Sequence, residues 1–178
     1  MNIKKIIFFL VMSSFLSSAG EISDRTELTI KEYFGSDINL SKYKISLSQE
    51  IRVTIQNECR QKFFSDYIYV WKIDHKDHTT HYAVLDNVMG KTQPITFLVI
   101  FDSRGMITNS SVVKYREQHG GGVKEAHWLD QFIGLNGLSE FELGKNIDSI
   151  SGATISSRSM TLGIRKLSLL FNYLKEKV

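Results

Sequence analysis

The sequence is poor in cysteine and proline and carries only a small excess of positive charge. Cys59 is its single cysteine, which excludes an internal disulfide and a structural zinc site made of several thiolates. One proline and 12 glycines among 178 residues exclude a collagen-like or proline-rich disordered chain. The net charge of +3 comes from 22 Lys and Arg against 19 Asp and Glu, an excess too small to indicate a nucleic-acid partner.

The apolar run at the N-terminus, residues 6–16, is too short for a comfortable membrane span, which needs about 20 apolar residues. Two lysines precede this run and small residues ending in Ala19 follow it, an order typical of a secretory signal peptide. We therefore expect residues 1–19 to be a cleaved signal peptide and residues 20–178 to be the mature domain. An uncleaved N-terminal membrane anchor is the alternative, and both place the domain outside the cytoplasm, as a periplasmic or exported protein.

Hydrophobic periodicity predicts helices at both ends of the mature chain and strands between them. Spacings of three and four predict helices over residues 26–34, 49–63, 124–133 and 160–174. Alternation and apolar runs predict strands over residues 40–47, 67–72, 82–88, 95–101 and 106–115. This order indicates a single α+β domain with a mostly antiparallel sheet flanked by helices.

A loop of small residues precedes the last helix. Gly152 and Ala153 allow another group to approach the backbone closely, and Thr154 adds a hydroxyl at the same point. The first N–H groups of a helix have no internal partner and the helix dipole is positive there, so a phosphate is favoured at this end. The ordinary alternative is a simple helix cap, supplied by Ser151, Ser156 or Ser157.

The pattern Asp148-x-x-Ser151-Gly152-Ala153-Thr154 resembles the flavinylation motif of the FMN-binding domain family. That family includes the G subunit of the Rnf electron-transport complex, the C subunit of the sodium-translocating NADH:quinone reductase and the periplasmic domain of the nitrous-oxide regulator NosR. The resemblance implies that a flavin transferase joins FMN covalently, through its phosphate, to Thr154.

The resemblance extends from about residue 67 to residue 170. Glu117 with Gly120 and Gly121 resembles the family's Glu-x-x-Gly element, and the segment that starts at Trp128 resembles its aromatic-rich helix. By this resemblance we expect Glu117, Gly120 and Gly121 near the isoalloxazine ring. For Trp128, a ring contact and a place in the core are both open.

One other candidate site, a group of histidines, is weaker. His75, His78 and His81 are spaced by three with Asp74 and Asp77 among them, a set that could hold a metal or a haem. On an extended chain this spacing alternates faces, so we expect a solvated hairpin tip and no metal site.

The residues and the resemblance together predict an exported flavoprotein that carries covalent FMN and acts as an electron carrier rather than as a stand-alone enzyme, with no catalytic residues of its own. Its expected partners are the flavin transferase and redox proteins, membrane-bound ones included, with no nucleic acid. A non-redox scaffold or assembly protein of the same fold, and a small flavin-dependent reductase, are the alternatives.

Overall fold

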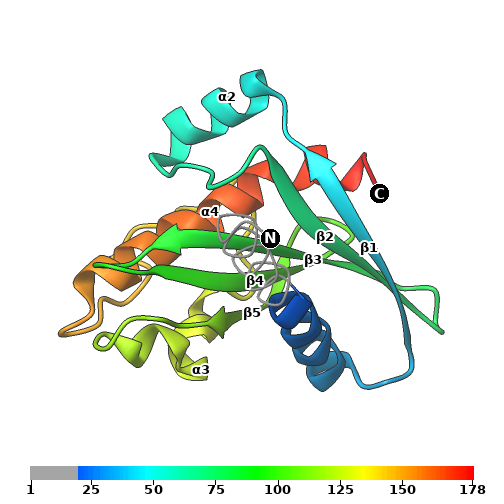
Figure 1. Cartoon of the computed structure of the whole chain (residues 1–178), viewed down its shortest axis with the longest axis horizontal. Helices are drawn as coiled ribbons and strands as arrows, with labels where there is room; N and C mark the ends of the chain where they lie inside the picture. The colour runs from blue at the N-terminus through cyan, green and yellow to red at the C-terminus, as the bar shows by residue number, and fades with distance from the viewer. Residues whose placement is uncertain (1–19) are drawn as a thin grey trace, which may run out of the picture. The chain divides into compact units, whose positions relative to one another are not determined.

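The computed structural model describes residues 20–178, and the predicted signal peptide lies outside the described residues (Figure 1). The chain divides into two compact units, one up to Ser36 and one from Asp37 to Val178. In the first unit, residues 20–34 form a helix. The helix ends where Gly35 takes a left-handed conformation (φ 83°) and donates its N–H to the Lys31 carbonyl at 2.8 Å. The predicted helix is confirmed, and it begins earlier than residue 26.

The second unit is built on a five-stranded antiparallel sheet with strand order β1-β2-β3-β4-β5. Neighbours in the sequence are therefore neighbours in the sheet, and short turns join all strands except β1 and β2, between which α2 is inserted. The predicted α+β class with an antiparallel sheet is confirmed. The strands are β1 (Ile38–Ser46), β2 (Tyr67–His75), β3 (Thr80–Met89), β4 (Pro94–Asp102) and β5 (Ile107–Lys114).

The long C-terminal helix α4 (Thr154–Lys175) supplies the helical side of the core. Its predicted apolar stripe is buried throughout, and it packs against the inward side chains of the sheet, such as Val88 and Phe97. Gly163 permits the close approach, since a Cβ there would lie 3.0 Å from Cζ of Phe97. The stripe consists of Met160, Ile164, Leu167, Phe171 and Leu174.

A buried ion pair, which no local pattern in the sequence indicated, also ties α4 to β3. Nζ of Lys166 lies 2.7 Å from Oδ2 of Asp86, and the two side chains are 0% and 8% exposed. The ammonium also donates to the Lys62 carbonyl at 2.8 Å and lies 4.6 Å from the ring centroid of Phe63. One cation therefore joins α4, β3 and the segment that follows α2.

Two predicted helices differ from those in the structure. The helix α2 (Gln49–Cys59) has the expected N-cap, Ser48, whose Oγ accepts the Ile51 N–H at 3.3 Å. It ends at Cys59 rather than residue 63 because Arg60 is left-handed (φ 54°).

The expected helix over residues 124–133 is wrong as a single element. Short turns replace it: η1 (Gly121–Lys124), α3 (Ala126–Leu129) and η2 (Asp130–Phe132). Extended backbone at Glu125 (φ −69°, ψ 131°) interrupts the helix, although Trp128 and Phe132 still reach the core as their spacing indicated.

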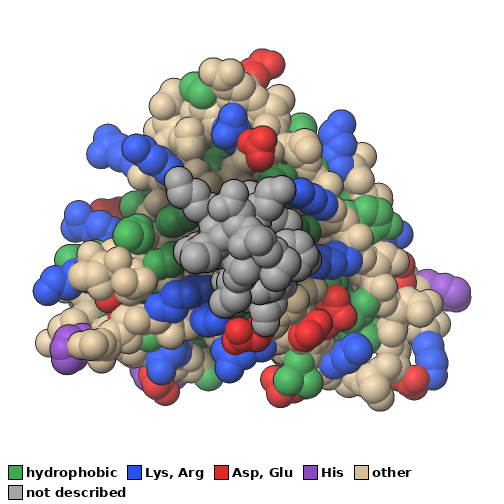
Figure 2. All heavy atoms as spheres, viewed as in Figure 1, with side chains coloured by type: hydrophobic (Ala, Val, Ile, Leu, Met, Phe, Trp, Pro, Cys, Tyr) green, Lys and Arg blue, Asp and Glu red, His purple; other side chains and the backbone are tan. Residues whose placement is uncertain are grey.

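Among residues 20–178, no helix is both long and apolar enough to cross a membrane. In Figure 2, Lys and Arg side chains are spread around the visible face, and Asp and Glu side chains lie among them.

Candidate functional site

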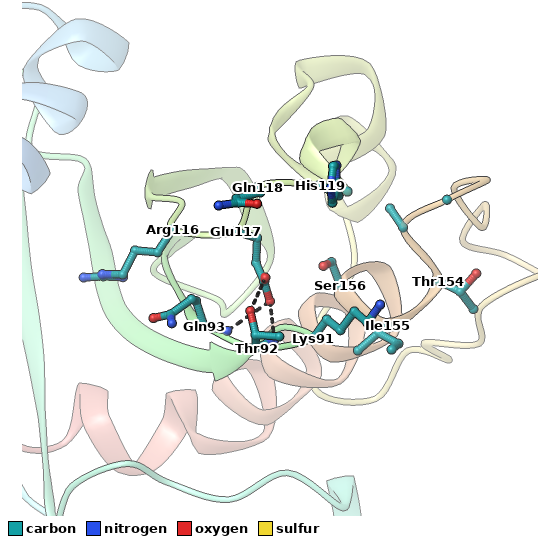
Figure 3. Close-up of a pocket in the computed structure, with 13 residues that line it drawn as sticks. Lys91, Thr92, Gln93, Arg116, Glu117, Gln118, His119, Thr154, Ile155 and Ser156 are labelled. Carbon is teal, nitrogen blue, oxygen red and sulfur yellow. Dashed lines mark hydrogen bonds between the residues drawn. The ribbon is translucent and has the colours of Figure 1, made fainter.

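A pocket of about 670 Å³ opens at the start of α4 (Figure 3). This volume lies within the range of pockets that hold cofactors, roughly 300–1,000 Å³. Three segments far apart in the sequence form its walls: the turn between β3 and β4, the chain that follows β5, and the first residues of α4. The lining residues are Lys91, Thr92, Gln93, Arg116, Glu117, Gln118, His119, Gly120, Gly152, Ala153, Thr154, Ile155 and Ser156.

The predicted loop of small residues forms one wall of this pocket. Gly152 is left-handed (φ 74°) and no heavy atom lies within 4 Å of where its Cβ would be, so the space beside it is open. Ala153 closes a turn by donating its N–H to the Ile150 carbonyl at 3.0 Å, and α4 then begins at Thr154. The exposed threonine hydroxyl is therefore carried by the first helical residue, because α4 begins six residues before the predicted helix over residues 160–174.

The start of α4 has no side-chain cap among the residues that the structure describes. Ser157 is buried, and its hydroxyl donates to the carbonyls of Ala153 and Thr154 at 3.0 and 3.3 Å instead of accepting an N–H. A simple serine cap therefore does not account for this loop. The N–H groups of Thr154, Ile155 and Ser156 remain at the positive end of a 22-residue helix, beside the pocket.

Glu117 organises the facing wall. Its Oε1 accepts the N–H groups of Thr92 and Gln93 at 2.6 and 3.0 Å, and its Oε2 accepts the Thr92 hydroxyl at 2.8 Å. The dashed lines in Figure 3 show this cluster. Gly90 is required beside it, because a Cβ there would lie 2.5 Å from Oε1 of Glu117.

These hydrogen bonds stabilise the ionised form of Glu117. The N–H groups of Thr92 and then Gln93, followed by the Thr92 hydroxyl, lower the pKa of the carboxyl group below its usual value. The carboxylate therefore lines the pocket as an anion whose hydrogen-bonding capacity is directed at the β3–β4 turn.

A second glycine closes the pocket between these walls. Gly120 is left-handed (φ 76°), and a Cβ there would lie 3.2 Å from the Tyr115 hydroxyl and 3.3 Å from Cβ of Ala153. The same hydroxyl donates to the His119 carbonyl at 2.5 Å, which fixes the chain just before Gly120. Gly120 therefore lets the chain after β5 pass directly against the loop of small residues.

Two predicted site residues, Trp128 and Asp148, form hydrogen bonds that hold the motif loop, the segment from Asp148 to Thr154. Nε1 of Trp128 donates to the Asp148 carbonyl at 2.8 Å, and the Asp148 N–H donates to Oε1 of Gln131, also at 2.8 Å. Trp128 is 1% exposed and meets the ring of Phe132 edge-on, with the centroids 5.2 Å apart. Of the two roles left open for Trp128, the structure shows the core one.

Five of the nine predicted site residues line the pocket: Glu117, Gly120, Gly152, Ala153 and Thr154. The other four lie outside its lining. Asp148 and Trp128 hold the motif loop, Ser151 is exposed in the turn before α4, and Gly121 begins η1.

Sequence reasoning missed most of the facing wall. Lys91, Thr92 and Gln93 were not among the predicted site residues, and the Glu117 hydrogen bonds show how this turn joins the site. Arg116 also lines the pocket, but its guanidinium donates to the Pro94 carbonyl and to the Thr96 hydroxyl at 3.0 and 2.9 Å.

The histidine group gives a different result from the one expected. His75 and His81 converge, with Nε2 of the first 3.1 Å from Nδ1 of the second, while His78 takes the left-handed turn position (φ 66°). Burial, followed by the neighbouring His75, lowers the pKa of His81. Within residues 20–178, no group of three or more His, Cys, Asp or Glu is placed to hold a metal ion.

Comparison with known families identifies the class of domain that contains this pocket. Residues 90–168 match the model of the FMN-binding domain family. All thirteen residues that line the pocket fall within the matched segment. This segment of the chain is therefore similar to FMN-binding domains, and FMN is the cofactor that the match indicates.

A solved structure extends the comparison to nearly the whole chain. The fold is similar to that of the C subunit of the Na⁺-translocating NADH-quinone reductase from Parabacteroides distasonis, with a TM-score of 0.55 and 15% sequence identity. The alignment covers 92% of this chain and 95% of that protein. A search of curated proteins finds no match to the sequence. The structural likeness confirms the expected fold.

Proposed function

We propose that the protein is an exported electron carrier whose FMN is attached covalently, through a phosphoester, to Thr154. The observation that carries this proposal is the position of Thr154. Its hydroxyl stands on the first residue of an uncapped helix, at the edge of a pocket that lies entirely within the segment matched to the FMN-binding family.

The residues present fit such a group. The N-terminal N–H groups of α4 provide an anion-binding position for a phosphate. The open space beside Gly152 leaves room at the backbone, and the cavity of about 670 Å³ lies next to it. When bound, FMN supplies one- and two-electron redox chemistry, while the protein supplies attachment, orientation and electrostatics.

Formation of the ester requires an activated donor. Thr154 Oγ would form a bond to the flavin phosphorus while the pyrophosphate bond of a flavin dinucleotide breaks and a nucleoside monophosphate leaves. The threonine proton passes to a base of the flavin transferase. The work of this chain is to present an exposed hydroxyl at a fixed helix start, where the helix dipole favours the incoming phosphate.

Thr154→Ala should have the largest effect on flavin attachment, because this variant removes the oxygen that forms the ester. Intact-mass spectrometry after co-production with a flavin transferase should show an added FMN minus one water in the wild type. The alanine variant should show no added mass, and Thr154→Ser should retain part of it because the hydroxyl survives.

Ser156→Ala is the matched control, since it removes a different hydroxyl from the same pocket lining. Flavin mass that persists in Thr154→Ala would contradict the attachment site. The loaded wild type should also be reduced by dithionite and reoxidised by a one-electron acceptor; irreversible reduction would contradict the carrier role. Recovery from the extracytoplasmic fraction without residues 1–19 would support the proposed export, and full-length cytoplasmic protein would count against it.

A further inference from the structure

We propose that Lys91 holds the flavin phosphate opposite the start of α4 and so makes the pocket selective for a phosphorylated flavin. This inference rests on the proposed function, because it names the residue that recognises one part of that cofactor. It begins from the charges of the pocket, which carries Lys91 and Arg116 as cations and Glu117 as an anion.

Two of these three charges already have partners in the protein. The Glu117 carboxylate accepts the N–H groups of Thr92 and Gln93 and the hydroxyl of Thr92. Arg116 is occupied by the Pro94 carbonyl and the Thr96 hydroxyl, and in Figure 3 its guanidinium points away from Thr154. Among the described residues, the ammonium of Lys91 has no hydrogen-bond acceptor or carboxylate partner, so it is the cation left for a ligand.

The fold fixes the backbone from which Lys91 extends. Gly90 donates its N–H to the Gln93 carbonyl at 2.9 Å, and Glu117 accepts the N–H groups of Thr92 and Gln93 in the same turn. The turn is therefore closed by bonds at both of its ends. In Figure 3 the Lys91 side chain extends from this turn toward the side of the pocket on which Thr154 is drawn, and both residues line the pocket.

This arrangement suits a phosphate better than a flavin ring edge. A lysine ammonium acts as a compact point charge with three donors, which matches phosphate oxygens without a demand for one plane. The helix start approaches the same position from the other wall with its own positive end. A phosphoester at Thr154 would thus lie between two positive groups.

The test separates phosphate recognition from covalent attachment. Thr154→Ala in the full chain removes the ester oxygen, so flavin can bind only non-covalently. The affinities of this variant for FMN and for riboflavin, which lacks the phosphate, are measured by flavin fluorescence. We expect FMN to bind more tightly than riboflavin, and the preference to decline as salt screens the charge.

Adding Lys91→Gln should weaken FMN binding by about tenfold, the size expected for one charge-assisted contact, and leave riboflavin binding unchanged. Lys91→Arg should keep most of the preference for FMN. Lys62→Gln is the control, because it removes an exposed lysine side chain that does not line the pocket.

Equal loss of FMN and riboflavin affinity in Lys91→Gln, no loss of either, or no binding of either flavin to the parent would overturn the inference. In the covalently loaded protein, a midpoint potential that falls in Lys91→Gln would also overturn it by placing the ammonium at the ring. Failure of the covalent attachment is seen separately, as absent flavin mass in the wild type. A phosphate preference that depends on Lys91 would survive that result.

Discussion

The start of α4 and the body of the same helix are built in opposite ways. At its start the helix has small residues, an exposed hydroxyl on Thr154 and N–H groups without a side-chain cap. Farther along, the same helix is buried on most of its surface, and Lys166 is 0% exposed and paired with Asp86. The start is left open to a ligand while the body of the helix is fixed in the core.

This difference suggests a division of work within one helix. An anion binds well at a helix start only if the helix is rigid, because the dipole and the N–H groups must remain directed at the ligand. The close contact at Gly163 and the pair of Lys166 with Asp86 both fix α4 against β3 and β4. The buried body therefore provides the rigidity that the open start lacks.

Breaking the buried pair should have the largest effect on stability. Lys166→Met leaves the Asp86 carboxylate buried without its counter-charge, and such a loss typically costs about 3–5 kcal/mol. Urea denaturation measures this loss. Burial already raises the pKa of Asp86, and removing Lys166 removes an opposing influence. A carboxyl whose folded pKa is raised destabilises above that pKa, so the deficit of Lys166→Met should shrink as the pH falls.

Replacing the partner residue Asp86 as well tests whether the loss comes from the unpaired charge. In the double variant Asp86→Leu with Lys166→Met, no buried charge remains, and much of the lost stability should return. Arg165→Met is the control on the same helix: its pair with Glu58 is 3.9 Å long and partly exposed, worth less than about 1 kcal/mol. Equal losses in Lys166→Met and Arg165→Met would show that the pair does not fix the helix.

Gly163→Ala should have the next largest effect on stability. The new methyl group would meet Cγ1 of Val88 and lie 3.0 Å from Cζ of Phe97, an overpacking that costs about 1–3 kcal/mol. This cost opposes the gain of about 1 kcal/mol that alanine usually brings to a helix interior. Thermal unfolding against Asn172→Ala, at an exposed position of α4, tests the prediction. A more stable Gly163→Ala would mean that α4 can move away from the sheet.

The sequence predicted the buried stripe of α4 and the small residues at its start because both depend on local signals, although the helix begins six residues before the predicted one. The stripe from Met160 to Leu174 follows helical spacing, and the small residues that end in Thr154 are contiguous. The strands could be predicted equally well from the sequence, because alternation and turn residues are local signals too. The helix expected over residues 124–133 failed at Glu125, where extended backbone interrupts an otherwise helical pattern.

The features that the sequence did not reveal are those that join distant residues. Lys166 and Asp86 are 80 positions apart, and nothing in their neighbourhoods distinguishes them from surface charges. Glu117 was expected in the site by resemblance, but its bonds to the turn 24 and 25 residues earlier come only from the register of β4 with β5. Lys91 owes its place in the site to this same connection.

The smallest expected effect on stability concerns the wall that faces the start of α4. Glu117→Gln removes the charge that holds the N–H groups of Thr92 and Gln93, so these two amides should exchange with solvent faster while global unfolding barely changes. Native-state hydrogen exchange, measured by NMR residue by residue, detects this local change. Glu125→Gln, an exposed glutamate outside the pocket lining, should leave both amides as protected as in the wild type.

The pH dependence of this wall sharpens the same prediction. Because hydrogen bonds lower the pKa of folded Glu117, the stabilisation of the turn is complete above the unfolded pKa and is lost as the pH falls through the lowered folded value. In the wild type, protection of Thr92 and Gln93 should therefore persist at a pH where a free glutamate is half protonated. In Glu117→Gln it should be weak and show no such titration. Protection that is equal in the two proteins across this range would mean that the turn is held without the carboxylate, and that Lys91 is positioned by the β3–β4 turn alone.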